Sequence, residues 1–441
     1  MTRLKTYLKN KNHKKRPGKE TMAAFMLPSL QPDFRKQIKS ECTKRSKYLQ
    51  STIFGTAFSP SDGFLVGCSS DGFIICWDLD RPSSSSYNIN NSSKPKEDQN
   101  QNQNQNQSQK RRKTEIIENS KPVFQFQVCR GALYDIQFIQ EGELLLACGQ
   151  DGVFLFDNFL SKIKSGESDI NVKPVVRHEL KSNPYSPVLP TEINRISYDA
   201  SAGHIYGAAG DGGGYIWDIS TAKMIGNLRH ASHSKISHSN GLHAIKAVGT
   251  DSQVPCNNCV LTGGANGIVG MWSGKDQKLI ESIDCNASMN NNSSNNNSNT
   301  TNKKNQGSGW VSSIDVDSAG NWAAIGGGTS DKKASTSSES GFVQLLNMQC
   351  RSITTCKETR ETIHDIAYHS SGIASVGNDG AVSFWNSVDV SGGPTGRAWL
   401  SSPASYSIAI HPDNNMMAIG NVSSQVDCFS EYLTKTCTLR R

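Results

Sequence analysis

The sequence of 441 residues has no long hydrophobic run, because no stretch approaches the roughly 18 apolar residues that are needed to span a bilayer. Its N-terminal segment also lacks the uninterrupted apolar core of a secretory signal. We therefore expect a soluble protein that stays inside the cell. The 12 cysteines stand at irregular spacings, which favours buried free thiols over a disulfide framework.

Motifs that carry catalysis are also missing. There is no G-x-S-x-G segment, no Walker loop, and no cluster of histidines and carboxylates at metal-ligand spacing. The CxxC pair, Cys256 and Cys259, has no second pair with which to complete the four ligands of a structural zinc site, so we interpret it as a polar loop ahead of a strand. We expect no enzyme activity, no catalytic residue, no metal, no cofactor and no small-molecule substrate.

Glycine-rich and histidine-rich stretches need a separate interpretation. Residues 211–214 and 326–328 stand at strand ends rather than before a helix, so we predict tight turns instead of a phosphate-binding loop. Serine and lysine separate four histidines, which we interpret as part of a polar loop rather than a metal site: His230, His233, His238 and His243.

What the sequence does contain is a repeated unit with a fixed distance from a turn to an aromatic residue. In four units a tryptophan follows six residues after the first residue of an Asp-Gly or Asn-Gly pair: Asp71 and Trp77, Asp211 and Trp217, Asn266 and Trp272, Asp379 and Trp385. Phe156 follows Asp151 in a shorter unit, and Leu346 and Phe429 follow serines in two degenerate units. We predict a type I′ hairpin turn at each pair, because these residues tolerate positive φ.

Each turn stands between two predicted strands. The strand before it is rich in small residues, as in HIYGAAG and CVLTGGA, and upstream lies a strand with apolar residues at relative positions 1, 4 and 6, such as Leu133, Ile136 and Phe138. A weaker fourth strand follows, as in KLIESID. Four strands in each of seven units predict an all-β fold, a seven-bladed β-propeller in which every sheet packs against both of its neighbours. Either KTCTLRR completes the seventh blade alone, or residues 45–52 lend it a strand.

The repeats resemble WD40 repeats. Trp-Asp pairs stand at Trp77-Asp78 and Trp217-Asp218, and altered pairs begin with Phe156, Trp272 and Trp385. The Gly-His pair that is usual near the start of such repeats is nearly absent. We assign structural blade positions to eight residues: Trp77, Asp78, Phe156, Trp217, Asp218, Trp272, Trp385 and Phe429.

Within the WD40 proteins, the order of segments is similar to that of the WD40 subunits of the THO complex, part of the TREX machinery for messenger-RNA export. The similar segments include PTEINRISYD, GWVSSIDVDSAGNWAAIGGG and the terminal AIGNVSSQVDCFSEYLTKTCTLRR, and the likeness covers about residues 50–441 without the inserts. The resemblance implies a nuclear, non-catalytic scaffold that acts in mRNA processing and nuclear mRNA export. It also implies docking on other THO subunits, their coiled-coil components first, but it transfers no contact residue.

A second interpretation is a substrate receptor of a cullin-type ubiquitin ligase. Many WD40 proteins play this role through an Arg or Lys two residues after a Trp-Asp pair. The corresponding residues here are Asp80 and Ser220, and neither is basic. We therefore favour the scaffold.

Basic charge is concentrated at the N-terminus. Residues 1–47 hold 14 Lys and Arg against three Asp and Glu, a formal charge of +11. The whole chain has a formal net charge of +7, so the remaining residues together carry −4. We predict a disordered arm at 1–47, the propeller at 48–441, and low-complexity inserts at about 83–121, 286–308 and 330–340.

Two basic clusters are predicted nuclear import signals, with plain solvated charge as the alternative: Lys14, Lys15 and Arg16 in the arm, and Lys110, Arg111, Arg112 and Lys113 in the first insert. Any RNA contact made by the arm would be weak and blind to sequence, because aromatic residues are absent from both clusters. No contact with membranes is expected.

Overall fold

The repeats fold into seven antiparallel sheets. The computed structural model describes residues 51–61, 63–80, 117–164, 176–178, 192–228, 241–249, 258–291, 309–330, 339–413, 416–430 and 433–441. Each sheet has at least four strands that follow one another in chain order, so each sheet is one propeller blade. The seven-bladed all-β fold predicted from the sequence is therefore confirmed.

The strands of the first four blades run from the innermost outward. Blade 1 consists of β1 (Ile53–Phe58), β2 (Phe64–Ser69), β3 (Phe73–Asp78) and β5 (Phe124–Gln127), and blade 2 of β6 (Leu133–Ile139), β7 (Leu144–Gly149), β8 (Gly152–Asp157) and β9 (Val176–His178). Blade 3 consists of β10 (Ile193–Asp199), β11 (His204–Ala209), β12 (Gly214–Asp218) and β13 (Lys223–Leu228), and blade 4 of β14 (Leu242–Val248), β15 (Cys259–Gly264), β16 (Ile268–Ser273) and β17 (Leu279–Asp284).

The remaining three blades follow the same order. Blade 5 consists of β18 (Gly309–Val316), β19 (Trp322–Ser330), β20 (Glu339–Asn347) and β21 (Ser352–Thr359), and blade 6 of β22 (Ile363–His369), β23 (Gly372–Gly377), β24 (Ala381–Trp385) and β25 (Gly396–Trp399). Blade 7 consists of β26 (Ser405–Ile410), β27 (Met416–Asn421), β28 (Gln425–Ser430) and β29 (Lys435–Arg440), with β4 (Ile117–Ser120) added as a fifth strand. Short helices lie between strands: the 3-10 helix η3 (Gln140–Gly142), α3 (Phe159–Lys164) and α4 (Cys285–Asn291).

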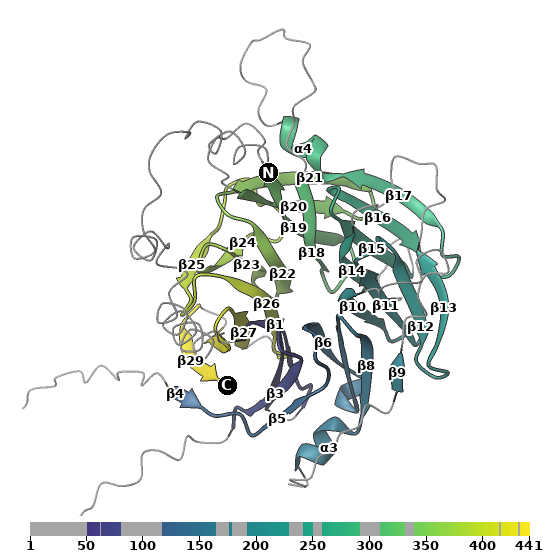
Figure 1. Ribbon diagram of the computed structural model, residues 1–441. Helices are drawn as coiled ribbons and strands as arrows, with labels where there is room; N and C mark the ends of the chain where they lie inside the picture. The colour runs from purple at the N-terminus through teal and green to yellow at the C-terminus, as the bar shows by residue number, and fades with distance from the viewer. Residues whose placement is uncertain are drawn as a thin grey trace, which may run out of the picture. The chain divides into compact units, whose positions relative to one another are not determined.

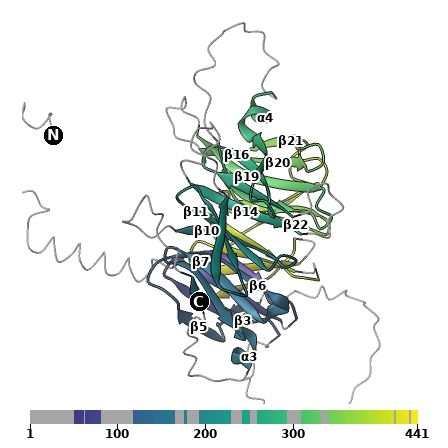
Figure 2. The same ribbon diagram turned by 90° about the vertical axis from the view of Figure 1, so that its right-hand side faces the viewer.

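The blades close into a ring through their inner strands. Every inner strand contacts the inner strand of the next blade, and β26 of blade 7 contacts β1 of blade 1 (Figure 1). Seen from the side, α4 extends from blade 4 next to β16 and β21 (Figure 2). The seven units therefore share one continuous ring of interfaces, which explains how a single fold accommodates so long a chain.

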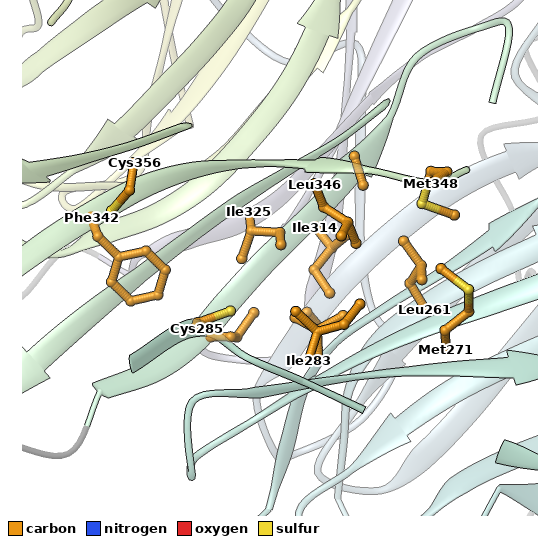
Figure 3. Close-up of a cluster of buried hydrophobic side chains, with 14 of the residues drawn as sticks. Leu261, Met271, Ile283, Cys285, Ile314, Ile325, Phe342, Leu346, Met348 and Cys356 are labelled. Carbon is orange, nitrogen blue, oxygen red and sulfur yellow. The ribbon is translucent and has the colours of Figure 1, made fainter. Parts of the chain in front are cut away.

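The interfaces between blades are apolar. Figure 3 shows the one between blades 4 and 5, where Leu261 and Met271 face Ile314 and Ile325. The aromatic blade positions Trp77, Phe156, Trp217, Trp272, Trp385 and Phe429 are all buried. Small residues in the second strand make room for them. A methyl group on Gly207 would lie 2.8 Å from Cζ3 of Trp217, so glycine is required at that position.

The predicted hairpins form, but their predicted turn type is wrong. At the Asp71-Gly72 turn only the glycine has positive φ, +78°, and its N–H donates to the carbonyl of Ser69 at 3.0 Å. This is the three-residue loop that ends in a left-handed glycine, not a type I′ turn. The aspartate position contributes an acceptor oxygen, since the carboxylate of Asp211 accepts the N–H of Gly213 at 2.9 Å. Asp or Asn therefore favours this turn by capping it.

In blades 1, 3 and 6 the polar residue after the aromatic residue caps the next turn. Asp78 accepts the N–H of Asp80 at 3.0 Å, and Asp218 accepts the N–H of Ser220 at 2.7 Å. Asn386, in the altered pair of blade 6, accepts the N–H of Val388 at 2.8 Å. Altered Trp-Asp pairs can therefore keep the hydrogen bond, because the cap requires only an acceptor oxygen.

The glycines at 326–328 do not form the predicted turn at a strand end. They lie within β19, where neighbouring side chains leave no space for larger residues. A methyl group on Gly326 would lie 2.8 Å from Cγ2 of Ile363, and one on Gly328 would lie 2.1 Å from Cζ2 of Trp310. These glycines are packing positions at the interface with blade 6 and beneath the indole ring.

The seventh blade is completed by the chain's own last strand, β29, which is the first of the two predicted alternatives. Blades 7 and 1 are joined in two ways. β4, which lies between β3 and β5 of blade 1 in the chain, pairs with β29, and side chains bridge the two blades. The guanidinium of Arg441 donates to Asp71 at 2.6 Å and to Ser51 at 2.8 Å, and it lies 4.0 Å from the ring centroid of Phe73. Trp77 donates its indole N–H to the carbonyl of Arg440 at 3.3 Å.

The first predicted insert ends earlier than expected, and the second begins later. Residues 117–120, assigned to the first insert, form β4, which pairs in parallel with β29. The second insert was predicted to start at 286, but α4 continues to Asn291, and its Cys285 and Met289 pack in the cluster of Figure 3. The arm at 1–47, both basic clusters and the centres of the inserts lie outside the described residues.

Candidate functional site: the mouth of the central cavity

A β-bulge recurs at the same place in all seven inner strands. In each, the pairing with the second strand skips one residue, which follows an apolar residue in six blades and Ser405 in blade 7. A bulge re-aims the side chain of the extra residue and is a device found beside binding sites. The seven skipped residues, one from each blade, are Phe54, Tyr134, Asn194, His243, Ser312, His364 and Tyr406.

These seven residues line one cavity of about 280 Å³, together with Arg195 and Trp310. We call it the cup. All of its lining residues are partly exposed, so their side chains form an accessible surface rather than a closed core. Because each blade contributes one bulged residue, the cup lies on the axis of the ring. Its volume is slightly below the range of about 300–1,000 Å³ that is typical of sites for drug-sized ligands, so it suits a single side chain.

Aromatic rings form one continuous side of the cup. The imidazole of His364 stacks on Tyr406 with 4.6 Å between ring centroids, and Tyr406 meets Phe54 edge-on at 5.2 Å. Phe54 in turn lies 5.7 Å from Tyr134. This arc therefore runs from blade 6 through blades 7 and 1 to blade 2. Trp310 adds an indole ring from blade 5, lying on Gly328 of the adjacent strand.

Below the cup, an arginine joins two aspartates from different blades. Arg195 of blade 3 donates to Asp365 of blade 6 and to Ser313 at 3.1 Å, and its Nε lies 3.9 Å from the carboxylate of Asp135 in blade 2. The side chain of Asp365 is only 4% exposed. We call Arg195, Asp135 and Asp365 the central triad. Burial raises the pKa of the Asp135 carboxyl, and the charge of Arg195 opposes that rise.

A second cavity, of about 340 Å³, lies on the other side of Arg195 and is lined by inner strands of all seven blades. Polar side chains join neighbouring blades along it. Asp135 accepts the N–H of Ile196 at 3.0 Å, and Asp365 accepts the N–H of Ile408 at 2.8 Å. Lys246 pairs with Asp315 at 2.6 Å. Arg195 lines both cavities and therefore marks the floor of the cup.

Two uncharged side chains of the cup, His243 and Tyr134, have shifted pKa values. Burial lowers the pKa of His243, although the nearby Glu192 opposes this shift, so the ring is neutral at pH 7. Burial, and then the charge of Glu192, raises the pKa of Tyr134. The Tyr134 hydroxyl donates to Glu192 at 3.3 Å. Two of the cup's polar groups are thus held neutral, and a carboxylate lies beside one of them.

The described residues contain no group of three or more His, Cys, Asp or Glu side chains that could hold a metal ion. Within the same part of the chain, no helix is long and apolar enough to cross a membrane. Cys259 of the CxxC pair is buried at the start of β15, whereas Cys256 lies outside the described residues. Burial raises the pKa of several other thiols, such as Cys76, which keeps them protonated and unreactive.

Sequence reasoning did not identify the cup. It used positions 1, 4 and 6 of each inner strand and passed over position 2, which the bulge directs to the axis. An aromatic or histidine residue stands there in five of the seven units, and that recurrence was the available signal. His243, grouped with three loop histidines, instead belongs to β14 and lines the cup.

Comparison with known proteins agrees with the geometry. The family model described as WD domain, G-beta repeat matches residues 42–78, the part of the chain that holds the first three strands. THO complex subunit 6 of Arabidopsis thaliana is 24% identical over 407 residues, which cover 88% of this chain and 92% of that protein. This match covers far more of the chain than a single repeat. The chain is therefore a seven-bladed WD40-type β-propeller that resembles THO complex subunit 6.

Proposed function

We propose that this protein is a non-catalytic scaffold subunit of a THO-type complex, acting in mRNA processing and nuclear mRNA export through contacts with other protein subunits. The observation that carries the proposal is the likeness to THO complex subunit 6 over nearly the full length of both chains. A rigid ring whose blades are joined by side-chain hydrogen bonds suits this role, because it offers several preformed surfaces. The fold alone does not identify the function, since propellers serve many functions.

The partners that we propose are the coiled-coil subunits of the complex. Affinity-tagged full-length protein, recovered from nuclear extract with and without ribonuclease, should retain coiled-coil THO subunits in both samples. A tagged propeller of unrelated sequence is the control. Loss of these subunits after ribonuclease treatment would show that RNA bridges them, and their absence from both samples would contradict the proposal.

The same purification tests the ubiquitin-ligase alternative. Recovery of a cullin adaptor without THO subunits would favour the substrate receptor. Asp80 and Ser220, the two positions where a basic residue would serve that role, lie in turns that Asp78 and Asp218 cap. No feature of these turns favours the receptor over the scaffold.

We further propose nuclear localisation, with import through one or both basic clusters. Deletion of residues 1–20 combined with alanine at Lys110, Arg111, Arg112 and Lys113 should move a fluorescent fusion to the cytoplasm. At least one of the two clusters, attached alone, should also carry into the nucleus a reporter that is too large to diffuse through nuclear pores. A reporter that stays cytoplasmic with each of the two clusters would contradict direct import.

A further inference from the structure

The cup has the features of a site for a positively charged side chain. Its walls are aromatic faces and edges, and cations are attracted to the negative faces of aromatic rings when they lie within about 6 Å of the centroid. Phe54, Tyr134, Tyr406 and Trp310 supply four such rings from four blades. Bulges direct three of these rings, those of Phe54, Tyr134 and Tyr406, to the axis, and the fourth, Trp310, lies on Gly328 of the adjacent strand.

The formal charge around the cup is negative. Arg195 lines the cup and is paired with Asp135 and Asp365, which line the second cavity, and Glu192 accepts the hydroxyl of the cup residue Tyr134. That is one positive charge against three negative charges, or −2. His243 adds no charge, because burial lowers its pKa. A ligand with a positive charge would reduce this imbalance, whereas a phosphate group or a carboxylate would increase it.

We propose that the cup binds an arginine or lysine side chain from an extended segment of a partner protein. The volume of about 280 Å³ suits one such side chain, with its aliphatic stem against the rings and its charged end toward Glu192, the carboxylate that accepts the Tyr134 hydroxyl. The proposal does not depend on the THO-type assembly, because a short peptide can be tested on the cup directly. A nucleobase is the competing occupant, and the negative charge disfavours the phosphates attached to it.

The test uses the full-length protein and two acetylated, amidated pentapeptides, Gly-Ala-Arg-Ala-Gly and its citrulline counterpart. Citrulline keeps the shape of arginine but has no charge. Ligand-observed NMR titration suits weak binding by a single side chain. We expect the arginine peptide to bind about tenfold more tightly than the citrulline peptide, since a partly enclosed cation interacts with several rings at once.

Variants locate the binding. Phe54→Leu and Tyr406→Leu keep an apolar side chain but remove the ring, and each should weaken binding of the arginine peptide by about three- to tenfold. Phe58→Leu is the matched control: it is the same substitution in the same strand, but Phe58 lines the second cavity instead of the cup. It should leave binding unchanged. Thermal unfolding of each variant identifies any that fails to fold, and Trp310→Leu then replaces that variant.

Three outcomes would overturn the proposal. The first is equal binding of the arginine and citrulline peptides. The second is unchanged binding in both Phe54→Leu and Tyr406→Leu. The third is that a uridine octanucleotide displaces the arginine peptide and itself fails to bind Phe54→Leu and Tyr406→Leu. This result would show that the cup binds bases. Failure of any kind here leaves the purification result untouched, so the two proposals are tested separately.

Discussion

Replacing Arg195 with methionine should destabilise the whole ring, because this residue joins blades 2, 3 and 6. Methionine retains most of the side-chain length and removes the charge. The variant then leaves Asp135 and Asp365 without their shared cation, and the Asp365 side chain is only 4% exposed. Breaking a buried ion pair by removing one partner costs about 3–5 kcal/mol. We expect a loss of that size in the free energy of unfolding at pH 7.5, measured by urea denaturation.

Arg397→Met is the matched control. Arg397 pairs with Asp379 at the outer part of blade 6, where its side chain is 46% exposed, against 19% for Arg195. Exposed pairs contribute about 0–1 kcal/mol, because water screens both charges. The same substitution should therefore have a small effect at this position. An equal loss in the two variants would refute the role assigned to the central triad.

The destabilisation should also depend on pH. Burial raises the pKa of Asp135 and Arg195 opposes the rise, so removal of Arg195 raises this pKa further. A carboxyl whose pKa is higher in the folded state binds a proton more readily there, so its destabilising effect is present above that pKa and is lost as the pH falls through it. The difference in the free energy of unfolding between Arg195→Met and wild type should therefore become smaller from pH 7.5 to pH 5.5. Adding Asp135→Asn to Arg195→Met should make this difference smaller at pH 7.5. A constant difference would contradict this account.

Three further predictions concern packing and ring closure. Trp217→Ala should lower the free energy of unfolding by about 3–5 kcal/mol, while Trp399→Ala, whose side chain is 74% exposed, should change it by less than about 0.5 kcal/mol; similar values would count against the blade assignment. Gly207→Ala should lower the free energy of unfolding by about 1–3 kcal/mol, because the added methyl group overpacks the site. Gly392→Ala should not lower it, since no atom lies within 4 Å of the added methyl group; a larger loss in Gly392→Ala than in Gly207→Ala would refute the packing argument. Arg441→Ala should increase the rate of amide hydrogen exchange in β1 and β29 and leave the rate in blade 4 unchanged. An equal change in all three places would show that Arg441 does not stabilise the contact between blades 7 and 1.

The architecture was predictable because it depends on local rules that repeat. The distance from Asp71 to Trp77, repeated with small changes, requires only that a hairpin and a buried ring recur in every unit. One local rule was misapplied. Asp-Gly is typical of type I′ turns, but here the loop has three residues and the aspartate acts as a hydrogen-bond acceptor. Loop length depends on strand register, and composition alone does not set register.

The cup was less predictable, because it depends on contacts between blades that are distant in sequence. Tyr406 and Phe54 are neighbours only once the ring closes. Arg195 of blade 3 pairs with Asp365 of blade 6, on the opposite side of the ring axis. No spacing rule in one sequence connects such positions. The bulges themselves are also invisible in an alternating pattern, because a skipped residue resembles an ordinary solvent-facing position. Insert boundaries failed for a related reason: β4 pairs with β29, more than 300 residues away.

The sevenfold bulge has a consequence for how binding specificity can change in this fold. Each blade presents one side chain at the mouth from a position that takes no part in the pairing with the second strand, so a substitution there leaves that pairing intact. Asn194 and Ser312 differ from the others, because their side chains also donate hydrogen bonds to the next blade. Substitutions at the mouth can therefore change what it binds while each blade keeps its strand pairing. Their effects are coupled where the side chains touch, as they do between Tyr406 and Phe54.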